Sequence, residues 1–432
     1  MDKNRIHLFR RRRETDKRYR RYVRCLTVIL LSVVMLCAGC TVKDAEGSSA
    51  GGSGEQTAAA DSRQNEAGSS TEAAPKTETA ATASRSWNNM SPVSSMDLLY
   101  ADQFSVDYYE NDISLITIGD TDQFLLLPEG MSAPVGLPDS IKILQKPVKN
   151  IYLVATSAMD DFIHLDAMDL IALSGTKDTG WYLPEAKTAM EEGKIAYAGK
   201  YSAPDYEKIL SSDCGLAVES TMIYHTPEVK EQLERLGIPV LVERSSYEGH
   251  PLGRMEWIRL YGVLTGKEAE AEQIFRENID ALSDVLDMEP SGKTAAFFYV
   301  TNSGSVNVRK NGDYIAKMIA LAGGTYIPGN AGSDENALST MNMDFESFYA
   351  AAKDADVLIY NSTIDGELTA IDELCAKNQL FADFKAVKEG NVWCTGKNMF
   401  QETMGLGDMI RDMNAVFADD TEYSFTYLHQ LK

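Results

Sequence analysis

The chain has few of the residues that build metal centres and disulfide frameworks. Only six cysteines and five histidines occur in 432 residues. Beyond residue 40 no two cysteines have C-x-x-C spacing, and no histidines have H-x-H or H-x-x-x-H spacing, so neither a zinc site nor a redox dithiol is predicted. Cys375 and Cys394 could form a disulfide, and the sequence leaves this open. We expect no metal held by protein ligands.

Catalytic signatures are absent as well. No G-x-S-x-G elbow, Walker loop or G-x-G-x-x-G fingerprint occurs. The glycine-containing loop at 303–305 is not followed by the helix that a phosphate loop needs. We therefore predict that the protein is not an enzyme, with an extracellular hydrolase of unrecognised site as one alternative.

Positive charge is scarce outside the first 24 residues, which hold eleven Lys/Arg and three Asp/Glu. The rest of the chain has 30 basic and 61 acidic residues, a net charge of −31. A body this acidic is not drawn to nucleic acid or to an anionic membrane surface by bulk attraction. We expect no nucleic-acid partner.

No apolar run is long enough for an ordinary transmembrane helix. Residues 25–38 are almost wholly apolar, but such a helix is only about 21 Å long, and a bilayer core needs about 20 residues. A basic run followed by a short apolar run is typical of a signal peptide. Residues 41–86 contain no aromatic residue and are rich in Ser, Gly, Ala, Thr and Glu, which is typical of a disordered linker. The sequence predicts an exported protein with a signal peptide over 1–39 and a linker over 40–86.

Short apolar runs alternate with helical patterns from residue 148 onward. The first series has strands near 148–155, 171–173, 195–197, 215–218 and 239–242, and the second has strands near 294–300, 356–360 and 391–394. Strands separated by helices indicate parallel-rich sheets with helices on their faces. We therefore predict an α/β protein with two Rossmann-like lobes, at 148–249 and 287–432, after an N-terminal extension at 87–147 that contains a β-hairpin (113–118 and 124–127).

One long helix is expected between the lobes. From Leu252 to Val285 there is no proline, and apolar residues recur at helical spacing. We predict an interlobe helix over 250–286, with an irregularity near Gly266, that permits only a small closure of the lobes.

The segment that ends in Cys40 resembles the lipobox of bacterial lipoproteins, in which the signal is cut before a cysteine that is then acylated. Cys37 stands where that motif usually has leucine, so an uncleaved signal anchor is the alternative. The resemblance implies lipidation of Cys40 and a location on the outer face of the cell membrane, in the manner of Gram-positive bacteria.

Four segments resemble the helical-backbone substrate-binding proteins of ABC importers for iron–siderophores, haem and cobalamin. They are Pro204–Val218, Leu233–Val242, His250–Gly266 and Ile319–Tyr326, in the order of that family. The family implies a monomeric receptor with a ligand cleft between its lobes, and a permease and an ATPase as partners. It also implies one acidic docking residue on each lobe, which by position are Glu228 and Glu346. A surface sensor or adhesin on the same fold is the alternative.

Ligands of open α/β sheets sit beyond the carboxyl ends of the strands. A ferric siderophore is often anionic and has planar chelating rings, which suit aromatic and cationic side chains. Ligand contacts are predicted at Arg309, Lys310, Trp181, Tyr182, Tyr201 and Met399. The ligand expected first is a ferric siderophore, with haem or a cobamide as alternatives, and no resident cofactor is expected.

Overall fold

The computed structural model describes residues 86–329 and 340–432. The predictions for the signal peptide, for Cys40 and for the linker up to residue 85 lie outside the described residues. Within the described ranges, no helix has both the length and the apolar character needed to cross a membrane.

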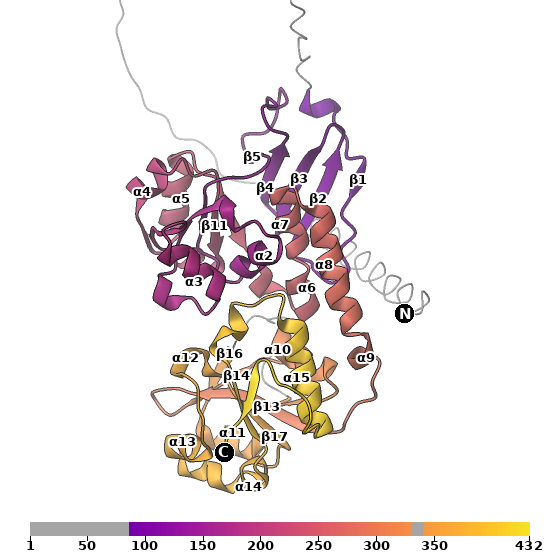
Figure 1. The fold of residues 1–432 in the computed structure, drawn as a ribbon, viewed down its shortest axis with the longest axis vertical. Helices are drawn as coiled ribbons and strands as arrows, with labels where there is room; N and C mark the ends of the chain where they lie inside the picture. The colour runs from indigo at the N-terminus through magenta and orange to yellow at the C-terminus, as the bar shows by residue number, and fades with distance from the viewer. Residues whose placement is uncertain (1–85, 330–339) are drawn as a thin grey trace, which may run out of the picture. The chain divides into compact units, whose positions relative to one another are not determined.

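A five-stranded sheet forms an N-terminal β domain (Figure 1). Its strands lie in sequence order, antiparallel except for the parallel pair β4–β5: β1 (Ser94–Ser95), β2 (Phe104–Tyr109), β3 (Ile113–Ile118), β4 (Asp122–Leu127) and β5 (Ile141–Gln145). β3 and β4 are the predicted hairpin. Alternating side chains point to opposite faces, so Val106 and Phe124 join the main core, whereas Ile113 and Leu125 pack beneath Trp87.

The first α/β lobe contains a five-stranded sheet that is parallel throughout, in the order β12-β11-β6-β7-β8. Its strands are β6 (Ile151–Leu153), β7 (Ile171–Ser174), β8 (Ala196–Tyr197), β11 (Ala217–Ser220) and β12 (Val240–Glu243), and β9 (Gly199–Lys200) pairs with β10 (Ala203–Pro204). The helices between them are α2 (Ala158–His164), α3 (Pro184–Glu191), α4 (Tyr206–Ser211) and α5 (Pro227–Arg235).

The second lobe has a seven-stranded mixed sheet, in the order β16-β14-β13-β17-β18-β19 with β15 also paired to β13. Its strands are β13 (Thr294–Val300), β14 (Val306–Arg309), β15 (Thr325–Ile327), β16 (Thr340–Met343), β17 (Val357–Tyr360), β18 (Val392–Thr395) and β19 (Leu428–Gln430). Its helices are α10 (Tyr314–Leu321), α11 (Phe345–Ala352), α12 (Ser362–Asp365), α13 (Ile371–Lys377), α14 (Lys385–Glu389) and α15 (Leu406–Ala418). The two-lobe α/β prediction is confirmed, and Cys375 and Cys394 are free thiols.

The connection between the lobes is not the single long helix that the sequence predicts. It consists of α6 (Pro251–Met255), α7 (Ile258–Thr265), α8 (Glu268–Ala281) and α9 (Ser283–Leu286). Gly266 ends α7 with a left-handed backbone, φ +72°, and α8 turns back alongside α7 (Figure 1). A Cβ at Gly262 would lie 2.5 Å from Ala271 Cβ, so glycine is what lets the two helices approach so closely. The predicted irregularity at Gly266 is therefore a complete reversal.

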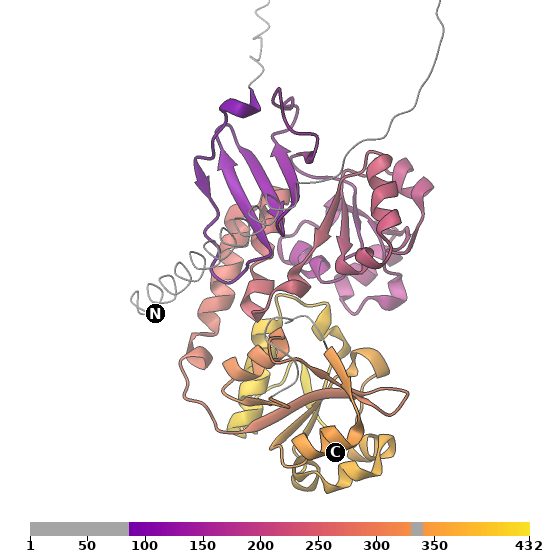
Figure 2. The same ribbon diagram turned by 180° about the vertical axis from the view of Figure 1, so that it is seen from behind.

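Two buried glutamates attach the β domain to these helices. The carboxylate of Glu256 accepts the backbone N–H groups of residues 99, 100 and 101 at 2.7–2.8 Å. That of Glu248 accepts the N–H groups of residues 102 and 103 and the indole N–H of Trp257 at 3.0 Å. Figure 2 shows the sheet beside α7 and α8 from behind. The segment 99–103 therefore gains, from side chains, the hydrogen bonds that its backbone needs when buried.

Candidate functional site

The two lobes meet at loops that follow the carboxyl ends of their strands. Gln401, in the loop after β18, accepts the N–H of Tyr182 at 2.8 Å and donates to the carbonyl of Gly180 at 2.9 Å, both in the loop after β7. Thr403 donates to the carbonyl of Ser157, after β6, at 3.0 Å. These are the edges at which ligands of open α/β sheets bind.

Asp160 adds a charged contact between the lobes. Its carboxylate, buried at the start of α2, accepts the N–H of Met404 at 2.7 Å. It also pairs with the imidazole of His164 at 3.3 Å. The hydrogen bond to Asp160 raises the pKa of His164 to about 9, and burial opposes this only in part. His164 is therefore protonated at neutral pH.

Arg309 lies at the end of β14, where it is largely buried. Its guanidinium pairs with Asp313 at 3.6 Å and lies 5.6 Å from the ring centre of Phe400, which belongs to the interlobe loop after β18. Burial raises the pKa of Asp313, and the positive charges of Arg309 and Arg254 oppose that rise. A cation held beneath an aromatic ring at the lobe junction is suited to an anionic, planar ligand, and the role predicted for Arg309 stays a prediction.

A second buried arginine, Arg254 in α6, is not among the contacts predicted from the sequence. It is 8 % exposed, and its guanidinium stacks 4.1 Å from the ring centre of Tyr314 in the second lobe. Burial raises the pKa of Asp161 and of Glu243 in the first lobe, and the charge of Arg254 opposes both shifts. The sequence does contain a signal for Arg254, because it is an arginine within an otherwise apolar helical segment. Charged side chains are rarely buried without a partner, so such an arginine indicates a site.

Hydrogen-bonding capacity remains unused around Arg254. Within the described residues, no hydrogen-bond partner is present for Asp161 Oδ1, Ser245 Oγ, Arg254 Nε or the hydroxyl of Tyr261. Buried polar atoms usually have partners. These atoms can therefore form hydrogen bonds with polar groups of a ligand. In the part of the chain that the structure describes, no group of three His, Cys, Asp or Glu residues could hold a metal ion.

The other predicted contact residues occupy different environments. Trp181 and Met399 are each 2 % exposed and pack in the main core, whereas Tyr182 is 47 % exposed beside the Gln401 contact. Tyr201 packs at the edge of the first-lobe cluster, and Lys310 is half-buried next to Arg309. Arg309 and Tyr182 are thus placed close to interlobe loops, and Trp181 and Met399 lie inside the protein.

The sequence profile of the periplasmic binding proteins matches residues 155–399, which is more than half of the chain. The chain belongs to the periplasmic binding protein family. This confirms the resemblance to solute-binding receptors and the prediction that the protein is not an enzyme.

Relatives and solved structures agree with this assignment. This periplasmic binding protein is 26 % identical over 334 residues to an uncharacterized lipoprotein of Methanocaldococcus jannaschii, covering 70 % of this chain and 77 % of the relative. A second uncharacterized lipoprotein of that organism is 27 % identical over 309 residues, covering 68 % and 75 %. A periplasmic haem-binding protein of Pseudomonas aeruginosa has the same fold, with a TM-score of 0.50, 15 % identity and coverage of 66 % of this chain and 98 % of that one.

Exposed apolar side chains follow several strands of this binding protein at their carboxyl ends. Besides Tyr182, these are Met222 and Tyr224 after β11 and Ile364 after β17, which are 45 %, 44 % and 67 % exposed. These three are not among the contacts predicted from the sequence, because an isolated apolar residue in a loop carries no periodic signal. Apolar groups at this edge suit a ligand with an apolar or aromatic face.

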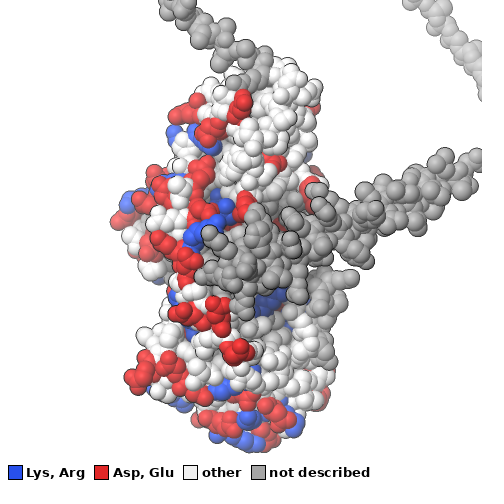
Figure 3. All heavy atoms as spheres, turned by 90° about the vertical axis from the view of Figure 1, so that its right-hand side faces the viewer, with Lys and Arg blue, Asp and Glu red and all other residues white. Residues whose placement is uncertain are grey.

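The two predicted docking glutamates are exposed, each in the first turn of a helix: Glu228 in α5 and Glu346 in α11. Acidic side chains are spread over the face drawn in Figure 3, so exposure alone does not distinguish these two. Their docking role remains a prediction.

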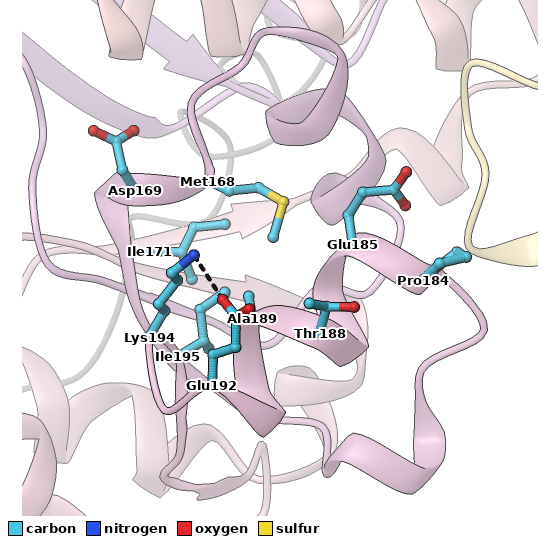
Figure 4. Close-up of a pocket in the computed structure, with 10 residues that line it drawn as sticks. All are labelled: Met168, Asp169, Ile171, Pro184, Glu185, Thr188, Ala189, Glu192, Lys194 and Ile195. Atoms are coloured by element: carbon cyan, nitrogen blue, oxygen red, sulfur yellow. Dashed lines mark ion pairs between the residues drawn. The ribbon is translucent and has the colours of Figure 1, made fainter.

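A hollow of about 800 Å³ lies elsewhere on the first lobe (Figure 4). Its walls are Met168, Asp169, Ile171, Pro184, Glu185, Thr188, Ala189, Glu192, Lys194 and Ile195, and Lys194 pairs with Glu192 at 2.7 Å. Ile171 is the first residue of β7, so the hollow is at the amino end of that strand. Ligand sites of such sheets lie at the opposite edge, and none of the predicted contact residues lines this hollow.

Proposed function

We propose that this periplasmic binding protein is the receptor of an ABC importer, held on the outer face of the cell membrane through Cys40. It captures a metal complex between its lobes, an anionic ferric siderophore first and haem or a cobamide next. The observation that carries the proposal is the position of Arg309, a cation beneath Phe400 where strand-end loops of both lobes meet. The lipoprotein relatives support the anchor.

Ligand binding without turnover is the expected result of a thermal-denaturation screen of the purified full chain. The probes are a ferric tris-catecholate, a ferric tris-hydroxamate, haemin and cyanocobalamin. A probe with Kd near 1 μM, present at 100 μM, stabilises the folded state by about 2.7 kcal/mol. Arg309→Gln should reduce the shift for an anionic probe, because the cation under Phe400 is lost. A wild-type chain that none of the four probes stabilises would contradict the proposal.

Delivery to the permease gives a second expected result. Reversing both docking charges, with Glu228→Lys and Glu346→Lys together, should abolish uptake of the bound probe in cells that carry the permease and leave its Kd unchanged. A matched control reverses two other exposed acidic residues, Glu231→Lys on α5 and Asp354→Lys after α11. Equal uptake by the Glu228→Lys/Glu346→Lys variant and by the control variant would contradict the docking role.

A further inference from the structure

We propose that the N-terminal β domain contributes to the ligand site by holding Arg244 of the first lobe, through Gln103, as an anion-binding side chain. This inference rests on the proposed function and deepens it, because it names a second cation for the anionic ligand. It also gives the β domain, which lies outside the segment matched by the family profile, a role in binding.

Arg244 lies at the edge of the sheet where the lobes meet. It directly follows β12, which runs parallel to β11, and β11 runs parallel to β6. The carboxyl ends of parallel strands share one edge of a sheet. Glu243, the last residue of β12, accepts a hydrogen bond from Ser157 at 3.3 Å, and the carbonyl of Ser157 accepts one from the second lobe. Arg244 therefore directly follows Glu243, whose side chain binds Ser157 at the contact between the lobes.

Neutral groups hold the guanidinium of Arg244. Its Nε and Nη2 both donate to the side-chain oxygen of Gln103, at 3.2 Å and 2.9 Å. Its Nη1 donates to the hydroxyl of Tyr224 at 3.4 Å, and the group lies 4.9 Å from the ring centre of Tyr247. These contacts fix the plane of the guanidinium, and none of the groups that make them carries a negative charge.

Within the described residues, the absence of a carboxylate partner distinguishes Arg244 from four other arginines. Ion pairs to Asp or Glu are made by Arg259, Arg276, Arg309 and Arg411. In the ranges 86–329 and 340–432, no ion pair involves Arg244. A half-buried, oriented guanidinium with N–H groups to spare is a good receptor for a carboxylate, catecholate or phosphate oxygen.

The β domain is built to present Gln103 in this orientation. The backbone N–H of Gln103 donates to buried Glu248 at 3.0 Å, and its side-chain amide donates to Asp102 at 2.7 Å, which turns the amide oxygen toward Arg244. A Cβ at Gly119, in the β3–β4 turn, would lie 3.1 Å from Arg244 Nη1. Glycine there leaves room for the guanidinium, and exposed Tyr224 provides an aromatic surface beside it.

Isothermal titration tests this inference. It measures the Kd of the full chain, at two salt concentrations, for the anionic probe that stabilises the chain most. Arg244→Gln should weaken binding about 10-fold to 100-fold, since one charge-assisted contact is lost, and should reduce the salt dependence of Kd. Gln103→Leu should weaken it about 3-fold to 10-fold, because the arginine keeps its charge but loses its orientation. The affinity of Arg244→Lys should lie between those of wild type and Arg244→Gln, because lysine keeps the positive charge but lacks the planar set of N–H groups of a guanidinium.

Arg235→Gln is the matched control, because it removes the same charge from an exposed position at the end of α5 and should leave Kd unchanged. Melting curves of all variants show whether each chain is folded. Unchanged affinity in folded Arg244→Gln, with affinity still lost in Arg309→Gln, overturns this inference and leaves the proposed function standing. A wild-type chain that binds no probe overturns the proposed function, and this inference with it.

Discussion

Glu256→Gln is expected to destabilise the attachment of the β domain by about 3–5 kcal/mol, as is typical when one partner of a buried charge pair is removed. The Glu256 side chain is fully buried, accepts three backbone N–H groups and pairs with Arg259 at 2.8 Å. A glutamine amide has one acceptor oxygen and directs N–H groups at the remaining donors, which leaves buried donors unsatisfied. Urea denaturation followed by the fluorescence of Trp257, which packs against Phe104 of the β domain, measures the loss.

Glu272→Gln provides the control for this prediction. Glu272 pairs with the same Arg259 at 2.7 Å, but its side chain is 36 % exposed, and it accepts no backbone N–H group in the described residues. Exposed ion pairs contribute about 1 kcal/mol or less. Equal effects of the two substitutions would show that the backbone hydrogen bonds to Glu256 do not hold the β domain.

The stability of the first lobe should fall as pH rises toward 8, and Glu219→Gln should remove much of this dependence. Glu219 is fully buried in β11, on the face of the sheet that also carries Ala217, and within the described residues neither carboxylate oxygen has a hydrogen-bond partner. Burial raises its pKa from 4.5 to about 8. The folded state therefore keeps a proton that the unfolded chain releases, so the stability is complete below about pH 4.5 and is lost progressively up to about pH 8.

The size of this effect follows from the shift in pKa. A rise from 4.5 to about 8 corresponds to about 4–5 kcal/mol of unfolding free energy. Unfolding by urea between pH 4.5 and pH 9 should show the difference between wild type and Glu219→Gln growing by that amount. Glu231→Gln, an exposed position on α5, should have the wild-type profile. If the unfolding free energies of wild type and Glu219→Gln change in parallel with pH, the pKa of this carboxyl group does not differ between the folded and unfolded states.

Local sequence patterns predicted the elements that carry a strong period or clear end signals. The strand expected near 294–300 is β13, and the strand expected near 239–242 is β12. The strands β1, β2, β5, β16 and β19 were not predicted. They are short or only half-buried, and a short strand is specified more by its neighbours than by its own residues.

The interlobe helices show where periodicity misleads. A helical period continues across Gly266 because both α7 and α8 bury one face, so the pattern does not record the change of direction. The reversal depends on one left-handed residue and on the close approach of Gly262 to Ala271. Such contacts join residues in two different helices, and hydrophobic spacing alone does not show them.

The sequence by itself determined the acidic charge, the scarcity of metal ligands, the two α/β series and the resemblance to substrate-binding receptors. These properties depend on composition and on patterns a few residues long. Only the tertiary structure decided that Arg254 and Arg309 lie by one tyrosine of the second lobe, Tyr314, and that Gln103 of the β domain holds Arg244. The partners in each of these contacts are 5 to 141 residues apart, and their meeting depends on how the sheets and helices pack, because a charged side chain in a folded chain takes its role from what packs around it.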